Sequence, residues 1–330
     1  MSIQIRLLLC LFFPLLSQAQ DVVIRSTQDL EETIQLGFLP FEASGGGSFP
    51  TPPDRVLLSD LEFSGRFEMF EISQMDSTSL RYLNEQLVMA YVRGSYHSDG
   101  KSMKLKCELI DVETGDAIIE EEYATSHKGY RQVAHRFADE LVYQLFGEKG
   151  IAQTQICYVS KRAGNRQVYV MDYDGAGVIT ITNNKTLNVL PGWYRDRQQL
   201  LFTSFLSGYP SFYIRDLTKG SNQVYLKTVG MNSSPHFNPV DDEIAYASAV
   251  DGNTEIFRKP SQKGRPIRLT FSGSIETSPS WAPNGYELAF TSDRSGSPMV
   301  YIMDRDGSNI RRLTYEGKYN TTRERCCTFL

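Results

Sequence analysis

Hydrophobic and polar positions repeat with a fixed period through the second half of the chain. The segments ICYVS, LLFTS, IAYAS and LAFTS begin at residues 156, 200, 244 and 288, each 44 residues after the one before. A second set, VYVMD, FYIRD, IFRKP and VYIMD, begins at 168, 212, 256 and 300 and keeps the same spacing. Both sets alternate apolar with small or polar residues, and this alternation predicts β-strands.

A third marker, proline followed two residues later by an aromatic residue, keeps the same period at 191–193, 235–237 and 279–281. Turn segments rich in Gly, Ser, Pro and Asp, such as 293–298, separate the strands, and a further strand is expected at 310–314. Several short strands in each repeat, without helical periodicity, are typical of a β-propeller blade. Blades stack around a central axis because that buries both faces of each small sheet.

Residues 20–150 lack this repeat and predict a separate α+β domain. Strands are expected at the start of 35–43 and over 66–72, 91–96, 103–110 and 117–123, with Ser98–Gly100 as a hairpin turn. A helix capped by 51–54 should end at Gly65, and a second helix should cover 80–87. The segment 131–146 places Val133, Phe137, Leu141 and Leu145 on one helical face, with Gly147 as the C-terminal cap. A polar, Gly-rich boundary at 147–153 then leads into the repeats, which are expected over 151–322.

The first 19 residues have the pattern of a secretory signal peptide. Arg6 precedes an apolar run from Leu7 to Leu16, and small residues stand before a cleavage position near Ala19. The run is too short for a membrane span, and no later stretch is long enough for one, so a membrane-spanning protein is not expected. A lipoprotein box at Cys10 is disfavoured because the residues before it are bulky. We therefore expect export of a mature chain that begins near Gln20.

Composition narrows the class of protein. The chain has 330 residues, a formal net charge of −5 and 41% hydrophobic residues, which suits a globular protein of about two domains. Without a basic excess, nucleic acid is not an expected partner. Besides Cys10, the cysteines are Cys107, Cys157 and the pair 326–327, a pattern that does not form a disulfide framework. Cys107 and Cys157 are more typical of isolated, buried free thiols.

A search for catalytic chemistry finds no recognisable set. The four histidines, at 97, 127, 135 and 236, lie outside metal-ligand spacing of another His or Cys. Nucleophile-elbow, P-loop and dinucleotide-binding motifs do not occur. The carboxylate pairs of Asp172–Gly175 and Asp304–Gly307 could suggest Ca²⁺, but a calcium loop needs further oxygen ligands, so hairpin turns are favoured. We therefore predict no catalytic, cofactor or metal site.

Three segments together resemble the TolB family, the periplasmic components of the Tol–Pal system of Gram-negative envelopes. They are LLSDLEFSGRFE at 57–68, GEKGIAQTQICYVS at 147–160 and the blade motif SPSWAPNGYELAFTSDRSGSPMVYIMD at 278–304. The resemblance covers residues 20 to about 321. The blade motif alone occurs in other propellers, whereas its combination with the N-terminal segments is far more specific.

The resemblance implies a non-enzymatic scaffold that supports outer-membrane integrity, invagination during cell division and protein import. Its implied partners are a Pal-like peptidoglycan-associated lipoprotein, bound at the propeller, and a TolA-like inner-membrane protein, bound by the mature N-terminus. The implied N-terminal switch segment consists of Asp21, Val22, Val23, Ile24 and Arg25. Its alternating apolar residues suit strand addition or groove docking. An ordinary edge strand is the alternative for this segment.

The sequence departs from the family pattern at its end. The family has six blades, whereas about four repeats occur here. The Pro–aromatic marker is due at 323–325, where the chain has RER, followed by CCTFL. A tail over 323–330 that loses the register so abruptly is typical of a truncated or frame-shifted product.

Two alternative functions stay open from the residues alone. One is a secreted hydrolase or lyase at the propeller axis, which predicts ionisable residues with perturbed pKa values in one pocket. The other is a carbohydrate-binding module, which needs exposed aromatic residues. Trp193 and Trp281 recur in register, and this indicates the core of a blade instead.

Overall fold

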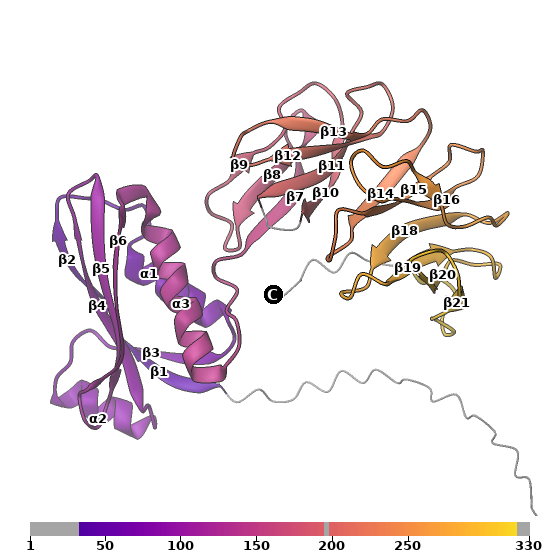
Figure 1. The fold of residues 1–330 in the computed structure, drawn as a ribbon. Helices are drawn as coiled ribbons and strands as arrows, with labels where there is room; N and C mark the ends of the chain where they lie inside the picture. Colours follow the sequence, from indigo (N-terminus) through magenta and orange to yellow (C-terminus); the bar gives the residue numbers. More distant parts are fainter. Residues whose placement is uncertain (1–32, 195–197, 322–330) are drawn as a thin grey trace, which may run out of the picture.

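The computed structural model describes residues 33–194 and 198–321, which form an N-terminal region and a series of propeller sheets (Figure 1). The predicted signal peptide, the segment 21–25 and the tail at 323–330 therefore lie outside the described residues. The predicted fold class, an α+β region followed by sheets of propeller type, is confirmed.

One six-stranded sheet with three α-helices makes up the N-terminal region. Its strands are β1 (Ile34–Phe38), β2 (Glu42–Gly45), β3 (Phe67–Glu71), β4 (Ala90–Ser98), β5 (Ser102–Asp111) and β6 (Ala117–Ser126). Its helices are α1 (Pro53–Phe63), α2 (Ser77–Glu85) and α3 (Tyr130–Phe146), and a short 3₁₀ turn covers His127–Gly129. The sheet order is β3-β1-β4-β5-β6, and β2 pairs with β4 beside this path.

Helices α1 and α3 pack together on one face of this sheet. Leu57 and Leu61 of α1 meet Phe137 and Leu141 of α3 in a buried cluster that also contains Leu105 of β5. The apolar stripe predicted along 131–146 is therefore the buried face of α3. Gly147 ends this helix in the left-handed conformation, with φ 70°, as predicted from its C-terminal position.

The predicted start of the second helix is three residues later than the observed one. A helix was expected over 80–87 because its apolar residues begin at Leu80, but α2 begins at Ser77. The carboxylate of Asp76 accepts hydrogen bonds from the backbone N–H groups of Ser79 and Thr78, and these bonds lower the pKa of Asp76. The N-cap therefore fixes the start of the helix, three residues before its first apolar side chain.

Four antiparallel sheets follow, each corresponding to one repeat. The first has three strands, β7 (Gln155–Ala163), β8 (Asn165–Asp172) and β9 (Ile179–Thr180). The second has β10 (Asn188–Tyr194), β11 (Gln199–Ser204), β12 (Ser211–Asp216) and β13 (Asn222–Leu226). The third has β14 (Asn232–Phe237), β15 (Ile244–Ser248), β16 (Glu255–Lys259) and β17 (Ile267–Arg268). The fourth has β18 (Glu276–Trp281), β19 (Glu287–Ser292), β20 (Met299–Asp304) and β21 (Arg311–Arg312).

The Pro–aromatic marker forms the first strand of each four-stranded sheet, which the sequence alone did not assign. Each of these strands contains a bulge, and the residue before the proline has a positive φ: 53° at Leu190, 50° at Ser234 and 51° at Ser278. Trp281 is 5% exposed in the buried cluster between the third and fourth sheets. Trp193 is partly buried against the cluster between the first and second sheets. Both tryptophans are thus core residues, as predicted.

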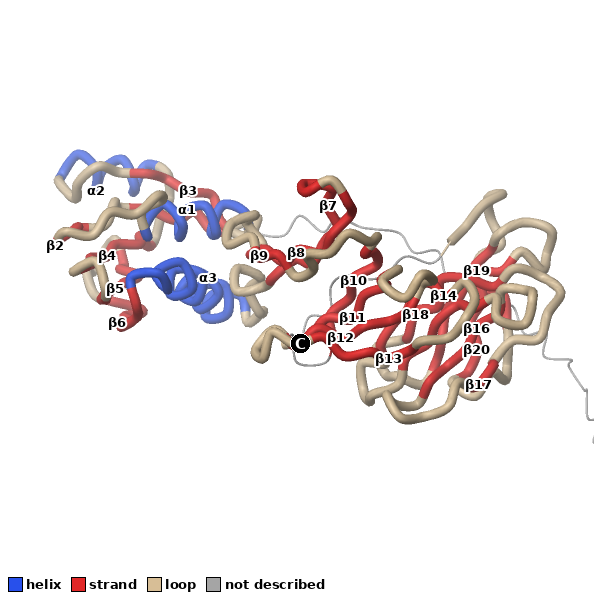
Figure 2. Tube along the Cα trace, turned by 90° about the horizontal axis from the view of Figure 1, so that it is seen from above, coloured by secondary structure: helices blue, strands red, loops and turns tan. Residues whose placement is uncertain are grey.

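Buried clusters join each sheet to the next one along the chain. Val168 and Phe202 belong to a cluster shared by the first and second sheets, and Phe212 and Tyr246 to one shared by the second and third. Ala247 and Phe290 belong to a cluster shared by the third and fourth. In the described part of the chain no such cluster joins the fourth sheet to the first, so the sheets form an open series (Figure 2).

Within the described part of the chain, neither Cys107 nor Cys157 forms a disulfide bond. Cys107 is fully buried in the N-terminal core, and this burial raises the pKa of its thiol, so that the group stays protonated. Cys157 is partly buried in the first propeller sheet. None of the described helices has the length and apolar character needed to cross a membrane.

Candidate functional site

The topology of the propeller sheets gives them two faces with different loops. Because consecutive strands run in opposite directions, the turns between second and third strands lie on the same side as the links between consecutive sheets. We call this side the loop face. It comprises the turns 205–210, 249–254 and 293–298 and the links 227–231, 269–275 and 313–319. Hydrogen bonds join a turn to a neighbouring link, as when the Ile275 N–H donates to the Asp293 carboxylate at 2.8 Å.

Exposed apolar side chains gather on the loop face, and they recur in the 44-residue register. One such pair is Leu206 and Val250, and another is Phe271 and Tyr315. A third set, spaced by the same 44 residues, consists of Met231, Ile275 and Tyr319. Phe271 and Tyr315 are 76% and 73% exposed, whereas most aromatic residues of the strands are buried. The full set is Leu206, Val229, Met231, Val250, Phe271, Ile275, Tyr315 and Tyr319. Apolar groups repeated on one face are typical of a protein-binding surface.

Arginine side chains lie over the two exposed aromatic rings. The guanidinium of Arg268 is 4.8 Å from the ring centre of Phe271, and that of Arg312 is 5.2 Å from the ring centre of Tyr315. Each arginine also donates from Nε to a backbone carbonyl, of Thr270 or Thr314 respectively. Aromatic and arginine residues are enriched at the centres of protein interfaces, where they supply contact area and hydrogen bonds together.

Buried amide side chains hold the loop-face links in place. Asn232 donates from Nδ2 to the carbonyl of Thr228 and to that of Pro210, each at 3.1 Å. Asn188 and Asn320 occupy the same position in other repeats, and Asn320 donates to the Glu316 carbonyl at 2.7 Å. Each amide satisfies backbone groups that would otherwise be unpaired beside a buried strand, so the links have defined shapes.

In the remaining repeat the equivalent residue, at position 276, is Glu instead of Asn. Its Oε1 accepts hydrogen bonds from the hydroxyls of Ser272 and Ser292 and from Arg294, at 2.6, 2.9 and 2.9 Å. The backbone carbonyls of this link are instead satisfied by Asn253, which donates to Ser272 and to Ser274 from the neighbouring turn. The carboxylate thus holds the guanidinium of Arg294, which also lies over the buried rings of Phe290 and Tyr301.

Two further buried carboxylates are paired with arginine in the same part of the molecule. Glu255 and Glu243 are fully buried, as is Glu276, and they accept from Arg268 at 2.8 Å and from Arg258 at 2.7 Å. A buried carboxylate is stable only when such a partner compensates its lost hydration. Glu255 thus fixes Arg268 at the loop face, whereas Glu243 and Arg258 lie on the opposite side, near the turn between β14 and β15.

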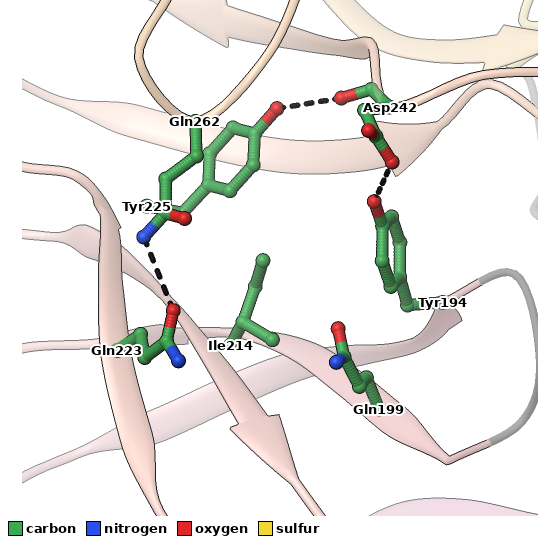
Figure 3. A pocket seen from close by; sticks show the side chains of 7 residues that line it. All are labelled: Tyr194, Gln199, Ile214, Gln223, Tyr225, Asp242 and Gln262. Atoms are coloured by element: carbon green, nitrogen blue, oxygen red, sulfur yellow. Dashed lines mark hydrogen bonds between the residues drawn. The ribbon is translucent and has the colours of Figure 1, made fainter.

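A small pocket lies between the second and third sheets, on the side opposite to the loop face (Figure 3). Its volume is about 240 Å³, and it is lined by Tyr194, Gln199, Ile214, Gln223, Tyr225, Asp242 and Gln262. The Tyr225 hydroxyl donates to the Asp242 backbone carbonyl at 2.7 Å, and the Tyr194 hydroxyl contacts the Asp242 carboxylate. Gln262 donates to the Val224 carbonyl at 3.2 Å.

This pocket differs from what the hydrolase or lyase hypothesis predicts. Burial raises the pKa of Tyr225, so its phenol stays protonated and cannot act as a base. Asp242 is the one carboxylate among the described lining residues, and it is hydrogen-bonded to Tyr194. The pocket therefore offers hydrogen-bonding groups rather than an acid–base pair.

The residues singled out in the sequence occupy different places. The N-terminal switch segment 21–25 lies outside the described residues. The two Asp-Gly turns are hairpin turns as predicted, with φ 86° at Gly175 and 90° at Gly307. The sequence predicted no metal site, but the carboxylate of Asp174 reaches the N-terminal region, where it lies with Asp60 and His135 in a group able to hold a metal ion.

Loop residues also repeat along the sequence, and this repeat predicts the loop face. Asn188, Asn232, Glu276 and Asn320 follow one another at intervals of 44 residues, as do Phe271 and Tyr315. When the loops of successive repeats are aligned in the same 44-residue register as the strands, the polar set and the aromatic pair both become apparent. By contrast, Asp60 and His135 are 75 residues apart, and no local spacing brings them together.

Comparison with known proteins places this architecture in a family. A profile of the TolB β-propeller domain matches residues 142–327, more than half of the chain. The Tol-Pal system protein TolB of Roseobacter denitrificans is 31% identical over 244 residues, which are 66% of this chain and 54% of that protein. A protein TolB homolog of Chlorobium chlorochromatii is 27% identical over 287 residues, which are 82% of this chain and 64% of that protein.

The fold agrees with a solved structure. The crystal structure of TolB from Acinetobacter baumannii superimposes with a TM-score of 0.74 at 24% identity, covering 88% of this chain and 73% of that one. The chain spans about half the length of the curated relatives that it matches, from 38% to 64%. On the match of the propeller profile, the chain belongs to the family of proteins that carry the TolB β-propeller domain.

Proposed function

We propose that this chain is a non-enzymatic, periplasmic binding scaffold of the Tol–Pal system. The observation that carries the proposal is the loop face, where exposed apolar side chains recur in register and arginines lie over two of the aromatic rings. The names of the curated relatives support membership of the Tol-Pal system. In that system the scaffold would contribute to outer-membrane integrity and to invagination during cell division.

The loop face is the proposed docking surface for a Pal-like peptidoglycan-associated lipoprotein. The N-terminal segment 21–25 is the proposed binding segment for a TolA-like inner-membrane protein. Two sites in different parts of the chain would let one scaffold connect the two membranes. Neither interaction involves a reaction, so this function needs shape and apolar contact instead of an acid–base pair.

A binding measurement with matched variants tests the lipoprotein site. Phe271→Ser with Tyr315→Ser removes two of the exposed rings on the loop face, those that lie under arginines, and the expected loss of affinity for the purified lipoprotein is about tenfold or more. Tyr286→Ser is the control, because Tyr286 is 68% exposed in the turn between β18 and β19, on the opposite side. Equal affinity of the loop-face variant and the control would contradict this assignment.

Deletion of residues 21–25 tests the second site separately. The shortened chain should lose capture of the TolA-like protein in a pull-down from envelope extracts and keep capture of the lipoprotein. Loss of both would indicate misfolding, which circular dichroism of the same sample detects. Retained capture of the TolA-like protein would contradict the role of this segment.

The alternative functions have weaker support. A carbohydrate-binding module needs open aromatic platforms, whereas the repeat tryptophans are in the core and arginines lie over the exposed rings of Phe271 and Tyr315. The described lining of the pocket in Figure 3 has one carboxylate, Asp242, which is hydrogen-bonded to Tyr194, and no second ionised group to pair with it in acid–base catalysis. Turnover of a glycan or ester substrate by the purified chain, lost on mutation of Asp242, would favour an enzyme over the scaffold.

A further inference from the structure

Three metal-ligating side chains from distant parts of the chain meet where the N-terminal region contacts the first propeller sheet. Asp60 lies on α1, His135 on α3, and Asp174 in the turn between β8 and β9. Each offers a ligand atom, and these atoms all lie within 4.8 Å of one another. Figure 2 shows the end of the first sheet, at β8 and β9, facing α1 and α3.

Two of these side chains are almost completely buried. The side chains of Asp60 and His135 are 1% and 4% exposed, and the His135 Nδ1 is 2.7 Å from Asp60 Oδ2. The Tyr173 hydroxyl donates to Asp60 Oδ1 at 2.5 Å. Among the described residues, His135 Nε2 has no hydrogen-bond partner although it is buried. A buried nitrogen without a hydrogen-bond partner is rare in proteins, so this imidazole nitrogen is available to a ligand.

The local charges also favour a cation. Asp60 and Asp174 supply two carboxylates, and Arg131, one turn before His135 on α3, forms an ion pair with Asp174. Arg131 Nε, too, is buried without a hydrogen-bond partner in the described part of the chain. Counted together, the two carboxylates and the one arginine carry one negative charge in excess. A divalent ion that displaced Arg131 from Asp174 would balance both carboxylates.

We propose that Asp60, His135 and Asp174 bind a divalent transition-metal ion of the zinc type. One imidazole nitrogen with two carboxylate oxygens suits Zn²⁺ better than Ca²⁺, which takes six to eight oxygen ligands. Water completes the coordination at the exposed side of the site, where the Asp174 side chain is 20% exposed. Such an ion would tie two helices of the N-terminal region to the first propeller sheet.

Calorimetric titration of the full mature chain with ZnCl₂ tests the site. The protein carries no polyhistidine tag and is first stripped of metal with a chelator. We expect one equivalent of zinc to bind and the thermal midpoint of unfolding to rise, because the ion binds the folded state only. Asp174→Asn should weaken zinc binding about tenfold or more, since it removes a ligand. Asp172→Asn is the control, since Asp172 lies in the same turn and outside the group.

Arg131→Gln separates the metal site from a purely ionic contact. If Arg131 competes with the ion for Asp174, this variant should bind zinc about tenfold more tightly than the wild type. If the group is only an ion-pair cluster, the variant should lose stability and gain no zinc affinity.

Two outcomes would overturn the proposal. One is unchanged zinc binding in both Asp174→Asn and His135→Gln, which would place the metal elsewhere on the chain. The other is no binding to wild type or to Arg131→Gln at millimolar zinc. Lipoprotein binding at the loop face is measured independently, so failure of one proposal leaves the other standing.

Discussion

His236 shows how one buried side chain makes stability depend on pH. It lies on β14, and its Nδ1 accepts a hydrogen bond from the backbone N–H of Trp281 at 3.2 Å, so the ring must be neutral at that nitrogen. Burial lowers the pKa of His236 from 6.5 to about 4. In the unfolded chain the imidazole gains a proton near pH 6.5, whereas in the folded chain it resists protonation down to about pH 4.

The unfolded state therefore binds more protons between these pH values, and stability must fall as the pH falls. The expected slope from this group approaches about 1.4 kcal/mol per pH unit within the window. Urea unfolding of wild type and of His236→Gln at pH 7.5, 6 and 5 isolates the contribution of His236 to the free energy of unfolding, because the carboxylates titrate alike in both proteins. An identical pH dependence of the two proteins would show that His236 takes up its proton at the same pH in the folded and in the unfolded chain.

Arg294 and Glu276 give a prediction about a buried charge. Arg294→Ala removes the cation from a fully buried carboxylate and should destabilise the fold by about 3–5 kcal/mol. The double variant Arg294→Ala with Glu276→Asn restores the amide found at the equivalent positions 188, 232 and 320. It should recover most of that loss in chemical denaturation. Equal stability of the single and double variants would contradict the charge argument.

The bulge in the first strand of each propeller sheet is a source of backbone strain. Leu190 has φ 53° and is 44% exposed, so it has little burial to lose on substitution. Leu190→Gly should be at least as stable as the wild type, because glycine adopts this conformation without steric cost. Leu190→Val should lose about 1 kcal/mol or more, because a β-branched side chain is disfavoured there. Thermal unfolding compares the two, and a valine variant more stable than the glycine variant would refute the strain.

Most strands and helices could be predicted because local patterns determine them. The alternation in ICYVS and its repeats, the apolar stripe of α3 and the Gly147 cap each act within a few residues. The start of α2 was missed because a polar N-cap, Asp76, determines it instead of an apolar residue. The Pro–aromatic segment was recognised as a marker but not as a strand, since proline within a strand normally argues against one and the bulge accommodates it here.

The candidate sites were harder to predict. The loop face depends on which loops share a side of the sheets, and that follows from strand direction instead of composition. The group at the domain contact depends on two helices and a turn that meet only in the folded chain. Because Asp60, His135 and Asp174 are far apart in the sequence, no pattern within a short segment predicts that they meet.

The open series of sheets leads to a prediction about association. Among the described residues, the first and fourth sheets have a buried cluster on one side only. Exposed aliphatic residues flank their short outer strands, with Ile179 55% and Leu313 54% exposed. Exposed apolar surface and open edges favour self-association.

We expect residues 20–330 to express poorly or to form oligomers, and residues 20–150 alone to be monomeric, because their sheet and helices supply most of the N-terminal core, to which Ala152 and Tyr173 also belong. Light scattering on both chains measures this. A monodisperse monomer of 20–330 that unfolds cooperatively would contradict the prediction and would favour a small ring closed in solution.

The contact between Tyr173 and Asp60 has a mechanical consequence. It attaches the N-terminal region to the first propeller sheet, and among the described residues the buried clusters of the later sheets join them to neighbouring sheets. The sheets are therefore mechanically in series, so the compliance of each interface between sheets adds to that of the next. A load applied at the first sheet is passed to α1 and α3 directly, whereas a load on the fourth must first deform three interfaces between sheets. The molecule is stiffest for forces that enter next to the joint and softest for forces that enter at its far end.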